Sequence, residues 1–142
     1  MSVRPVLSRL LPMCVLILLP GSATAQTVGE RVAVEGGAYW SISVAELQAL
    51  RATEGAPPLV NVHIPFQGDI AGTNASIAFN EIADHLDQLP ADKNAPVALY
   101  CRTGPMSVRA AATLVGLGYT QVYTLEGGFN AWAAAGLPMV NP

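Results

Sequence analysis

The stretch that decides the fold is Pro96–Ser107, which reads PVALYCRTGPMS. Its first part, residues 96–100, is a continuous apolar run of the kind found in a strand buried within a parallel sheet. The residues that follow are mostly polar or glycine and predict a short loop. From about Ser107 to Leu117, apolar residues recur at the spacing of one helix face. A strand, a tight loop and a helix in this order predict one unit of an α/β fold.

The flanking segments repeat this alternation of strands and helices. Ser43 and Glu46 have the spacing of a capping box, in which each side chain accepts a hydrogen bond from a free backbone N–H at the start of a helix. The predicted helices are residues 43–53, 81–89, 107–117 and 129–135. The predicted strands are residues 39–42, 59–62, 77–79, 96–100 and 121–124.

This order of elements predicts a single α/β domain over residues 26–142. We expect a central, mostly parallel sheet with helices on both faces. Residues 26–37 contain glycine and valine but give no clear prediction. Ligands of parallel sheets bind at the carboxyl ends of the strands, and Cys101 directly follows the central strand.

The loop after this strand has features that favour an ionised cysteine. Backbone N–H groups in such a turn can converge on one anion, and the dipole of the following helix adds partial positive charge. This environment favours the thiolate, the nucleophilic form of cysteine. Gly104 permits a positive φ, Arg102 supplies a full charge, and Ser107 is expected to cap the helix and donate to the sulfur. The alternative for Cys101 is a small apolar residue buried at a strand end.

Residues 1–25 are typical of a secretory signal peptide. Two arginines precede an apolar run over residues 10–19, and Ala23-Thr24-Ala25 forms a small-x-small cleavage site. The run is too short to span a bilayer comfortably. We expect export to the periplasm or secretion, followed by cleavage that leaves no stable membrane span. An uncleaved anchor or an ordinary N-terminal helix is the alternative.

Cleavage would leave one cysteine in the mature chain. Cys14 lies inside the apolar run, too early for a lipoprotein cysteine, and would be removed with the leader. Cys101 would then have no internal disulfide partner in an oxidising compartment. It is therefore either buried and inert or exposed and reactive.

The charge of the chain excludes some classes of partner. The sequence has seven Lys and Arg against ten Asp and Glu. Removal of Arg4 and Arg9 would leave five basic residues and a formal net charge of −5. No cluster of basic residues indicates a nucleic acid or an anionic membrane as a partner.

The loop resembles the active loop of the rhodanese-like sulfurtransferases. That loop begins with cysteine after a central strand, has glycine three residues later and ends with serine entering a helix. Residues 101–107 (CRTGPMS) match this pattern. The C-terminal signature of the family resembles residues 117–119 (LGY), Val122, residues 125–132 (LEGGFNAW) and residues 136–138 (GLP). The resemblance is clearest over residues 96–138 and fades before Ser43.

The resemblance implies a sulfurtransferase mechanism. Cys101 would attack the sulfane sulfur of a donor, form a persulfide and pass that sulfur to a thiol. The donor would be a small sulfur-containing anion or a persulfide, and no cofactor is implied. The substrate-binding residues would be the rest of the loop: Arg102, Thr103, Gly104, Pro105, Met106 and Ser107. Asn61 and His63, at the end of the second strand, are further candidates for the pocket.

Two departures from the family pattern reduce the positive charge of the site. The second strand usually ends in Asp-Val-Arg, whereas this chain has Asn61-Val62-His63. The loop usually carries arginine at its fifth or sixth position, where this chain has Pro105 and Met106, and proline also lacks an N–H. We therefore expect thiosulfate, a dianion, to bind less well than in the family's active members. An organic persulfide or polysulfide is more compatible.

Other chemistries have less support. The phosphatases related to this fold need an arginine six residues after the cysteine to hold phosphate, and Ser107 occupies that position. Cysteine and histidine do not have the spacing of a metal site. His85 is expected to be solvated, and Trp40 and Trp132 to belong to the core. Asp69 and Glu126 are expected to be solvated in loops, with a place near the pocket as the alternative. Arg109 is expected at the surface but could instead replace the missing loop arginine.

Three functions remain open, and the first two belong to different classes. The first is a sulfurtransferase or sulfur carrier, which the retained Cys101 favours. The second is a non-catalytic rhodanese-like binding module for a partner or small anion, which Asn61 and the missing loop arginine favour. The third is a redox thiol that would need a resolving cysteine from another protein. The sequence does not name the donor, the acceptor, the protein partner or the oligomeric state.

Overall fold

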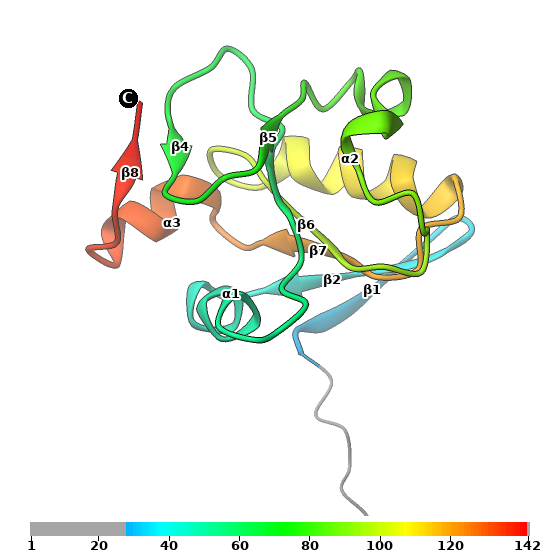
Figure 1. Cartoon of the computed structure of the whole chain (residues 1–142), viewed down its shortest axis with the longest axis horizontal. Helices are drawn as coiled ribbons and strands as arrows, with labels where there is room; N and C mark the ends of the chain where they lie inside the picture. The colour runs from blue at the N-terminus through cyan, green and yellow to red at the C-terminus, as the bar shows by residue number, and fades with distance from the viewer. Residues whose placement is uncertain (1–27, 142) are drawn as a thin grey trace, which may run out of the picture.

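The computed structural model describes residues 28–141. Its centre is a six-stranded sheet in the order β1-β2-β7-β6-β3-β5. All neighbouring strands in it are parallel except β1 and β2. Two further short strands, β4 and β8, pair with each other at one side (Figure 1). The strands are β1 (Glu30–Val34), β2 (Gly37–Ile42), β3 (Leu59–Asn61), β4 (Asp69–Ile70), β5 (Ala75–Ser76), β6 (Val97–Tyr100), β7 (Val122–Leu125) and β8 (Met139–Val140).

Helices cover both faces of the sheet, as predicted (Figure 1). The helices are α1 (Val44–Arg51), α2 (Pro105–Gly116) and α3 (Gly128–Ala134). One core cluster joins α2 to the sheet, and a second cluster joins α1 and α3 to the opposite face. A mostly parallel sheet between two helical layers places the carboxyl ends of β3, β6 and β7 at one edge.

Strand β6 shows how the sequence divides between the two cores. Its four residues are all buried, which confirms the predicted central strand. Val97 and Leu99 belong to the α2 cluster, whereas Ala98 and Tyr100 belong to the α1 and α3 cluster. Because side chains alternate along a strand, the next residue, Cys101, faces α2.

The N-terminal part of the domain is an antiparallel hairpin. Its second strand contains the predicted strand at residues 39–42, whereas residues 26–37 had given no clear prediction. β1 and β2 pair from Glu30 with Ser41 to Val34 with Gly37. The turn uses Gly36, whose φ is +90°. The predicted capping box then begins α1: Ser43 Oγ accepts from Glu46 N–H at 3.1 Å, and Glu46 Oε1 accepts from Ser43 N–H at 3.1 Å.

Residues 81–89 do not form the predicted α-helix. They form two 3-10 turns, η1 (Ile82–Asp84) and η2 (Leu86–Gln88), separated at His85, whose φ of −126° is not helical. Neither turn has a side-chain cap, and Asp and His are poor helix formers. The strand predicted at residues 77–79 is also misplaced, because β5 lies at Ala75–Ser76.

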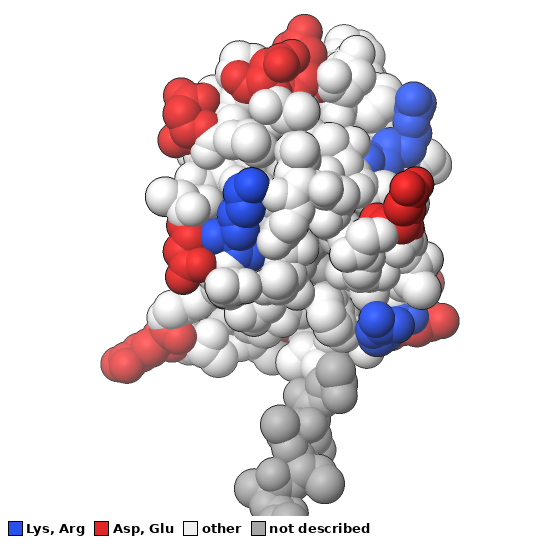
Figure 2. Space-filling model, turned by 90° about the vertical axis from the view of Figure 1, so that its right-hand side faces the viewer, with Lys and Arg blue, Asp and Glu red and all other residues white. Residues whose placement is uncertain are grey.

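Charged residues on the face seen in Figure 2 do not form a single-sign patch. The basic side chains lie apart from one another, and most of this face is uncharged. In the part of the chain that the structure describes, no helix is both long enough and apolar enough to cross a membrane. The predicted signal peptide, residues 1–25, lies outside the described residues.

Candidate active site

Cys101 lies where β6 ends and the loop to α2 begins. The residue is only 1% exposed and contributes to the core cluster beneath α2. The N–H of Gly104 donates to its Sγ at 3.0 Å. The sulfur therefore lies within the loop, bound by one backbone amide and shielded from solvent.

Helix α2 begins at Pro105, two residues earlier than predicted. Proline suits the first helical position because its φ is already helical and no N–H is needed there. Gly104 is the N-cap residue with a φ of +134°, which confirms the predicted positive φ.

The predicted role of Ser107 is wrong in both parts. Ser107 lies inside the first turn, fully buried, and does not cap the helix. Its hydroxyl donates to the carbonyl of Gly104 at 2.8 Å. In its contact with Cys101, at 3.8 Å, the thiol is the donor. The hydroxyl thus holds the loop in place through Gly104 and does not donate to the sulfur.

Further N–H groups of the cysteine loop and of the first turn of α2 have no acceptor within residues 28–141. Two belong to the first turn of α2, where N–H groups have no intrahelical partner. The helix dipole adds partial positive charge at the same place. These free donors belong to Arg102, Thr103, Met106 and Ser107. The loop therefore offers an anion several backbone donors besides Gly104.

The back of the loop is held by the start of α3. Phe129 N–H donates to the Cys101 carbonyl at 2.9 Å, and Asn130 N–H donates to the Arg102 carbonyl at 3.1 Å. The C=O and the N–H of one peptide plane point in opposite directions. The N–H groups of Arg102 and Thr103 therefore point away from α3. By holding two carbonyls, α3 orients two of the free donors.

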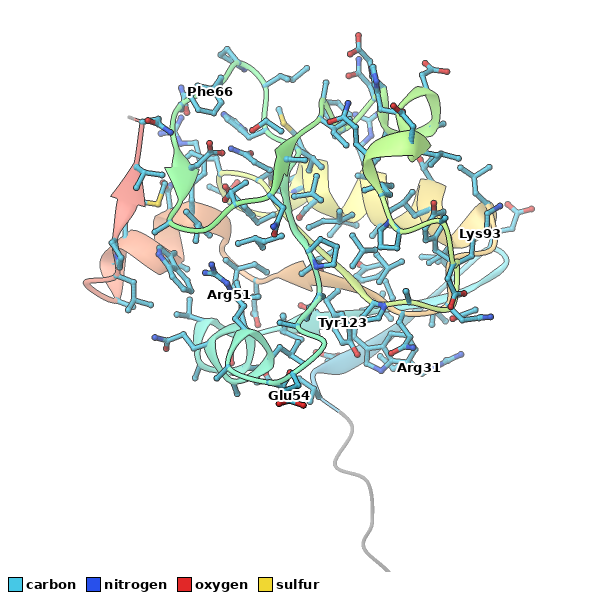
Figure 3. All side chains as sticks on the ribbon, in the orientation of Figure 1. Arg31, Arg51, Glu54, Phe66, Lys93 and Tyr123 are labelled. Carbon is cyan, nitrogen blue, oxygen red and sulfur yellow. The ribbon has the colours of Figure 1, made fainter. Side chains whose placement is uncertain are left out.

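A second loop, residues 62–68, approaches the cysteine loop from the end of β3. The ring of His63 meets the ring of Phe129 edge-on, with 5.5 Å between centroids. This contact places His63 beside Phe129, whose N–H holds the Cys101 carbonyl. Phe66, 53% exposed, lies further along this loop at the top of Figure 3.

The other candidate, Asn61, is buried at the end of β3. Its side chain binds the second loop at 3.0 Å, through the carbonyl of Gly68, and Asp69 at 2.9 Å. Asp69 was expected to be solvated in a loop, but its Oδ1 also accepts from the hydroxyl of Tyr100 at 3.2 Å. Neither residue points at the sulfur through any hydrogen bond in the described part of the chain. Both instead fix the backbone beside the site.

The arginines near the site remain at the surface. Arg102 and Arg109 are both exposed. The guanidinium of Arg109 lies 4.8 Å from the ring centroid of Phe79, so it stacks on that ring and does not replace the missing loop arginine. Arg102 is thus the cation that the loop itself supplies.

One surface hollow is lined by residues outside the cysteine loop. A hollow of about 470 Å³ is lined by Glu35, Gly36, Ala112, Thr113 and Gly116, none of which belongs to the cysteine loop. Within residues 28–141, no three His, Cys, Asp or Glu side chains gather as a metal ion would require. Trp132 is buried as expected, whereas Trp40 is only half-buried.

Comparison with known proteins identifies the architecture. The family model of the rhodanese-like domain matches residues 57–135, more than half of the chain. The chain belongs to the rhodanese-like family. The match contains β3, the cysteine loop and α3, which are the parts that build the site.

Relatives of this rhodanese-like chain include named sulfurtransferases. The thiosulfate sulfurtransferase GlpE of Pseudomonas syringae is 36% identical over 61% of this chain and 80% of its own length. A sulfurtransferase of Allochromatium vinosum is 44% identical over 40% of this chain, and the match spans about half, 51%, of that relative.

Solved structures show the same rhodanese-like fold. A rhodanese-related protein of Thermoplasma volcanium has a TM-score of 0.59 at 29% identity, covering 70% of this chain and 96% of that one. A rhodanese-like domain protein of Staphylococcus aureus has a TM-score of 0.58 at 27% identity, covering 71% and 98% of the two chains. The hairpin of β1 and β2 lies outside the residues that the family model matches.

Proposed function

We propose that this protein is a sulfurtransferase or sulfur carrier that forms a persulfide on Cys101. The observation that carries the proposal is the sulfur before the N-terminus of α2, 3.0 Å from the Gly104 amide, in a loop whose other N–H groups have no acceptor within residues 28–141. Such donors stabilise a thiolate and, after transfer, the outer sulfur of a persulfide. The named sulfurtransferases among the relatives support the same reaction class.

The proposed reaction has two balanced steps. With an organic persulfide R–S–SH, the thiolate of Cys101 attacks the outer sulfur, a new S–S bond forms, the old S–S bond breaks and the thiolate R–S⁻ leaves. With thiosulfate the leaving group is sulfite. In the second step an acceptor thiolate attacks the outer sulfur of the Cys101 persulfide, which restores the Cys101 thiolate and leaves the acceptor persulfidated.

The loop favours donors with little charge. Arg102 is exposed, and positions 105 and 106 carry no cation. Thiosulfate is a dianion, so it should bind less well here than in a loop that carries a further arginine. We therefore propose organic persulfides or polysulfides as the preferred donors.

A second function is favoured by the burial of the thiol. Cys101 is 1% exposed, so a donor reaches the sulfur only if the loop yields. A rhodanese-like module with a shielded thiol would bind a partner or small anion through the same free amides without transferring sulfur. Ser107, where the related phosphatases need arginine, offers no guanidinium for phosphate chemistry.

One experiment separates these functions. The protein is treated with thiosulfate, an aryl or alkyl persulfide and a polysulfide, and its mass is measured. One added sulfur atom on Cys101, removed by a small thiol and lost in Cys101→Ser, is the expected result. Alkylation by iodoacetamide from about pH 5 to pH 9 measures the thiolate fraction in parallel. A thiol that resists iodoacetamide and gains no sulfur from any donor supports the binding module; sulfenic acid alone supports a redox thiol.

We also propose that the protein is exported, on the basis of residues 1–25. Expression of the full chain in a bacterium with a periplasm, followed by fractionation and N-terminal sequencing, tests this. A periplasmic product that begins at Gln26 is expected. A full-length product that remains in the cytoplasm would contradict it.

A further inference from the structure

Asn61 stands where the family pattern has an aspartate, and the structure shows what the amide does there. The residue is 1% exposed, and its side chain is fully bonded. Nδ2 donates to the Gly68 carbonyl at 3.0 Å and to Asp69 Oδ1 at 2.9 Å, while Oδ1 accepts from His63 N–H at 3.0 Å. A carboxylate has no hydrogen to donate, so aspartate could make only the last of these bonds.

Asp69 supplies a carboxylate directly beside the Asn61 amide. Its Oδ1 accepts from Asn61, from the hydroxyl of Tyr100 at 3.2 Å and from Ser76 Oγ at 3.3 Å. Asp69 therefore bridges β3, β5 and β6 at their carboxyl ends. Two carboxylates at this distance would repel, so the amide at one position and the acid at the other depend on each other.

The pair closes residues 62–68 into a loop with a fixed base. The bonds of Asn61 join both ends of this loop, from the His63 amide to the Gly68 carbonyl. Within the loop, His63 Nε2 lies 3.1 Å from Gln67 Oε1. The His63 ring then packs edge-on against Phe129, whose N–H holds the Cys101 carbonyl. A chain of direct contacts thus connects the Asn61–Asp69 pair to the cysteine loop.

We propose that Asn61 and Asp69 are positioning residues that fix the 62–68 loop as one wall of the entrance to Cys101, and so set which size of donor reaches the sulfur. The statement about donors rests on the proposed sulfurtransferase function. The statement about the wall concerns access to the thiol and does not require that any sulfur is transferred.

The test compares access and kinetics in a set of variants. Asn61→Asp places two acids together, Asp69→Asn keeps an acceptor for Asn61 and Tyr100, and the double variant exchanges the two groups. His63→Ala removes the contact with Phe129 without touching the buried pair, and His85→Ala is the control on η1 and η2. Thermal unfolding confirms that each variant is folded.

Two readouts are measured. The first is the ratio of the alkylation rates of Cys101 by N-phenylmaleimide and by iodoacetamide, which reports the width of the entrance. The second is KM and kcat for transfer from an aryl persulfide to a small thiol. A shift in KM with kcat retained indicates a change in binding rather than in chemistry.

We expect the alkylation ratio to change by about threefold or more in Asn61→Asp and in His63→Ala, with KM changing about tenfold and kcat less than about threefold. His85→Ala stays near the parent, Asp69→Asn changes the ratio less than Asn61→Asp does because an acceptor for Asn61 and Tyr100 remains, and the exchange variant also lies closer to the parent than Asn61→Asp. The proposal would be overturned if a folded His63→Ala variant had the same alkylation ratio as the parent. It would also be overturned if the exchange variant differed from the parent in this ratio more than Asn61→Asp does. If the parent transfers no sulfur while the ratios of the two alkylation rates change as stated, the proposed function is wrong. In that case the proposal that the 62–68 loop limits access to Cys101 is still supported.

Discussion

A Cβ atom on Gly128 would lie 2.5 Å from the carbonyl oxygen of Arg102, and it would overlap the carbonyl of Cys101 as well. Gly128 has a φ of +57°, so a side chain there also meets ordinary left-handed strain. The glycine therefore lets α3 approach the cysteine loop closely enough for two backbone hydrogen bonds.

Gly128→Ala should destabilise the fold by about 3 kcal/mol, because strain and a backbone overlap add. The matched control is Gly136→Ala: its φ is +76°, but no atom lies within 4 Å of the added methyl group. It should cost only the strain, about 1 kcal/mol. Urea unfolding measures both, and equal losses would show that the close approach to Arg102 is not what requires glycine.

Ser107→Ala should weaken the cysteine loop more than it weakens the helix. The lost hydroxyl donates to Gly104, the residue whose amide binds the sulfur, so we expect about 1 kcal/mol of destabilisation and slower persulfide formation. Thr113→Ala is the control, because Thr113 makes the same kind of bond, to the Arg109 carbonyl, at an exposed site on α2. If both variants form persulfide at the parent rate, Ser107 has no part in shaping the loop.

Tyr100→Phe should lower the free energy of unfolding although the aromatic ring is retained. The buried hydroxyl accepts from Ile70 N–H at 3.0 Å and lies 2.7 Å from Thr73 Oγ1. Its removal leaves buried polar groups unpaired, for a loss of about 1–3 kcal/mol. Tyr119→Phe, whose hydroxyl is 3.5 Å from the Pro90 carbonyl, is the control and should change the unfolding free energy by less than about 0.5 kcal/mol.

The same hydroxyl predicts an alkaline dependence of stability. Burial raises the pKa of Tyr100 from 10.0 to about 12. The folded state therefore keeps the proton after the unfolded chain has lost it, and stability present below pH 10 is lost as pH rises towards 12. This contribution is about 2–3 kcal/mol. The difference in unfolding free energy between the parent and Tyr100→Phe should narrow over that range, and a constant difference would contradict the assignment.

Arg102→Ala should discriminate between donors by their charge. Arg102 is the exposed cation of the loop, so its loss should raise KM for thiosulfate about fivefold to tenfold, an effect that added salt reduces. KM for an uncharged organic donor should change less than about twofold. Arg31→Ala, on the edge strand β1, is the control. Equal effects on the two donors would show that Arg102 acts through the loop's shape and not its charge.

Local patterns predicted the elements whose stabilisation is local. The capping box of Ser43 and Glu46 needs only residues three apart, and α1 begins there. Residues 81–89 carried helical spacing after Asn80, a candidate cap, but no side chain caps either turn in the structure and the chain formed two 3-10 turns instead. The β1–β2 hairpin has a local pattern as well: Val32 and Val34 alternate before a two-residue turn at Glu35 and Gly36.

The sequence predicts which residues make up the site but not the hydrogen bonds and packing that hold them in place. Cys101 after a buried strand and Gly104 in the loop were evident from residue order alone. The hydrogen bond between Asn61 and Asp69 was not evident, because it depends on how the backbone between these two residues, eight positions apart, folds back on itself. The burial of Cys101 to 1% exposure likewise follows from packing beneath α2, which the order of residues does not express.

The two hydrogen bonds from Phe129 and Asn130 have a consequence for protein engineering. A graft of Cys101–Ser107 into another scaffold would copy the reactive segment without the element that aims its amides. The transplant must therefore carry Gly127–Asn130 as a second, non-contiguous piece, held at the same spacing. The smallest unit that could be moved to another protein with its reactive cysteine correctly surrounded is therefore these two segments together.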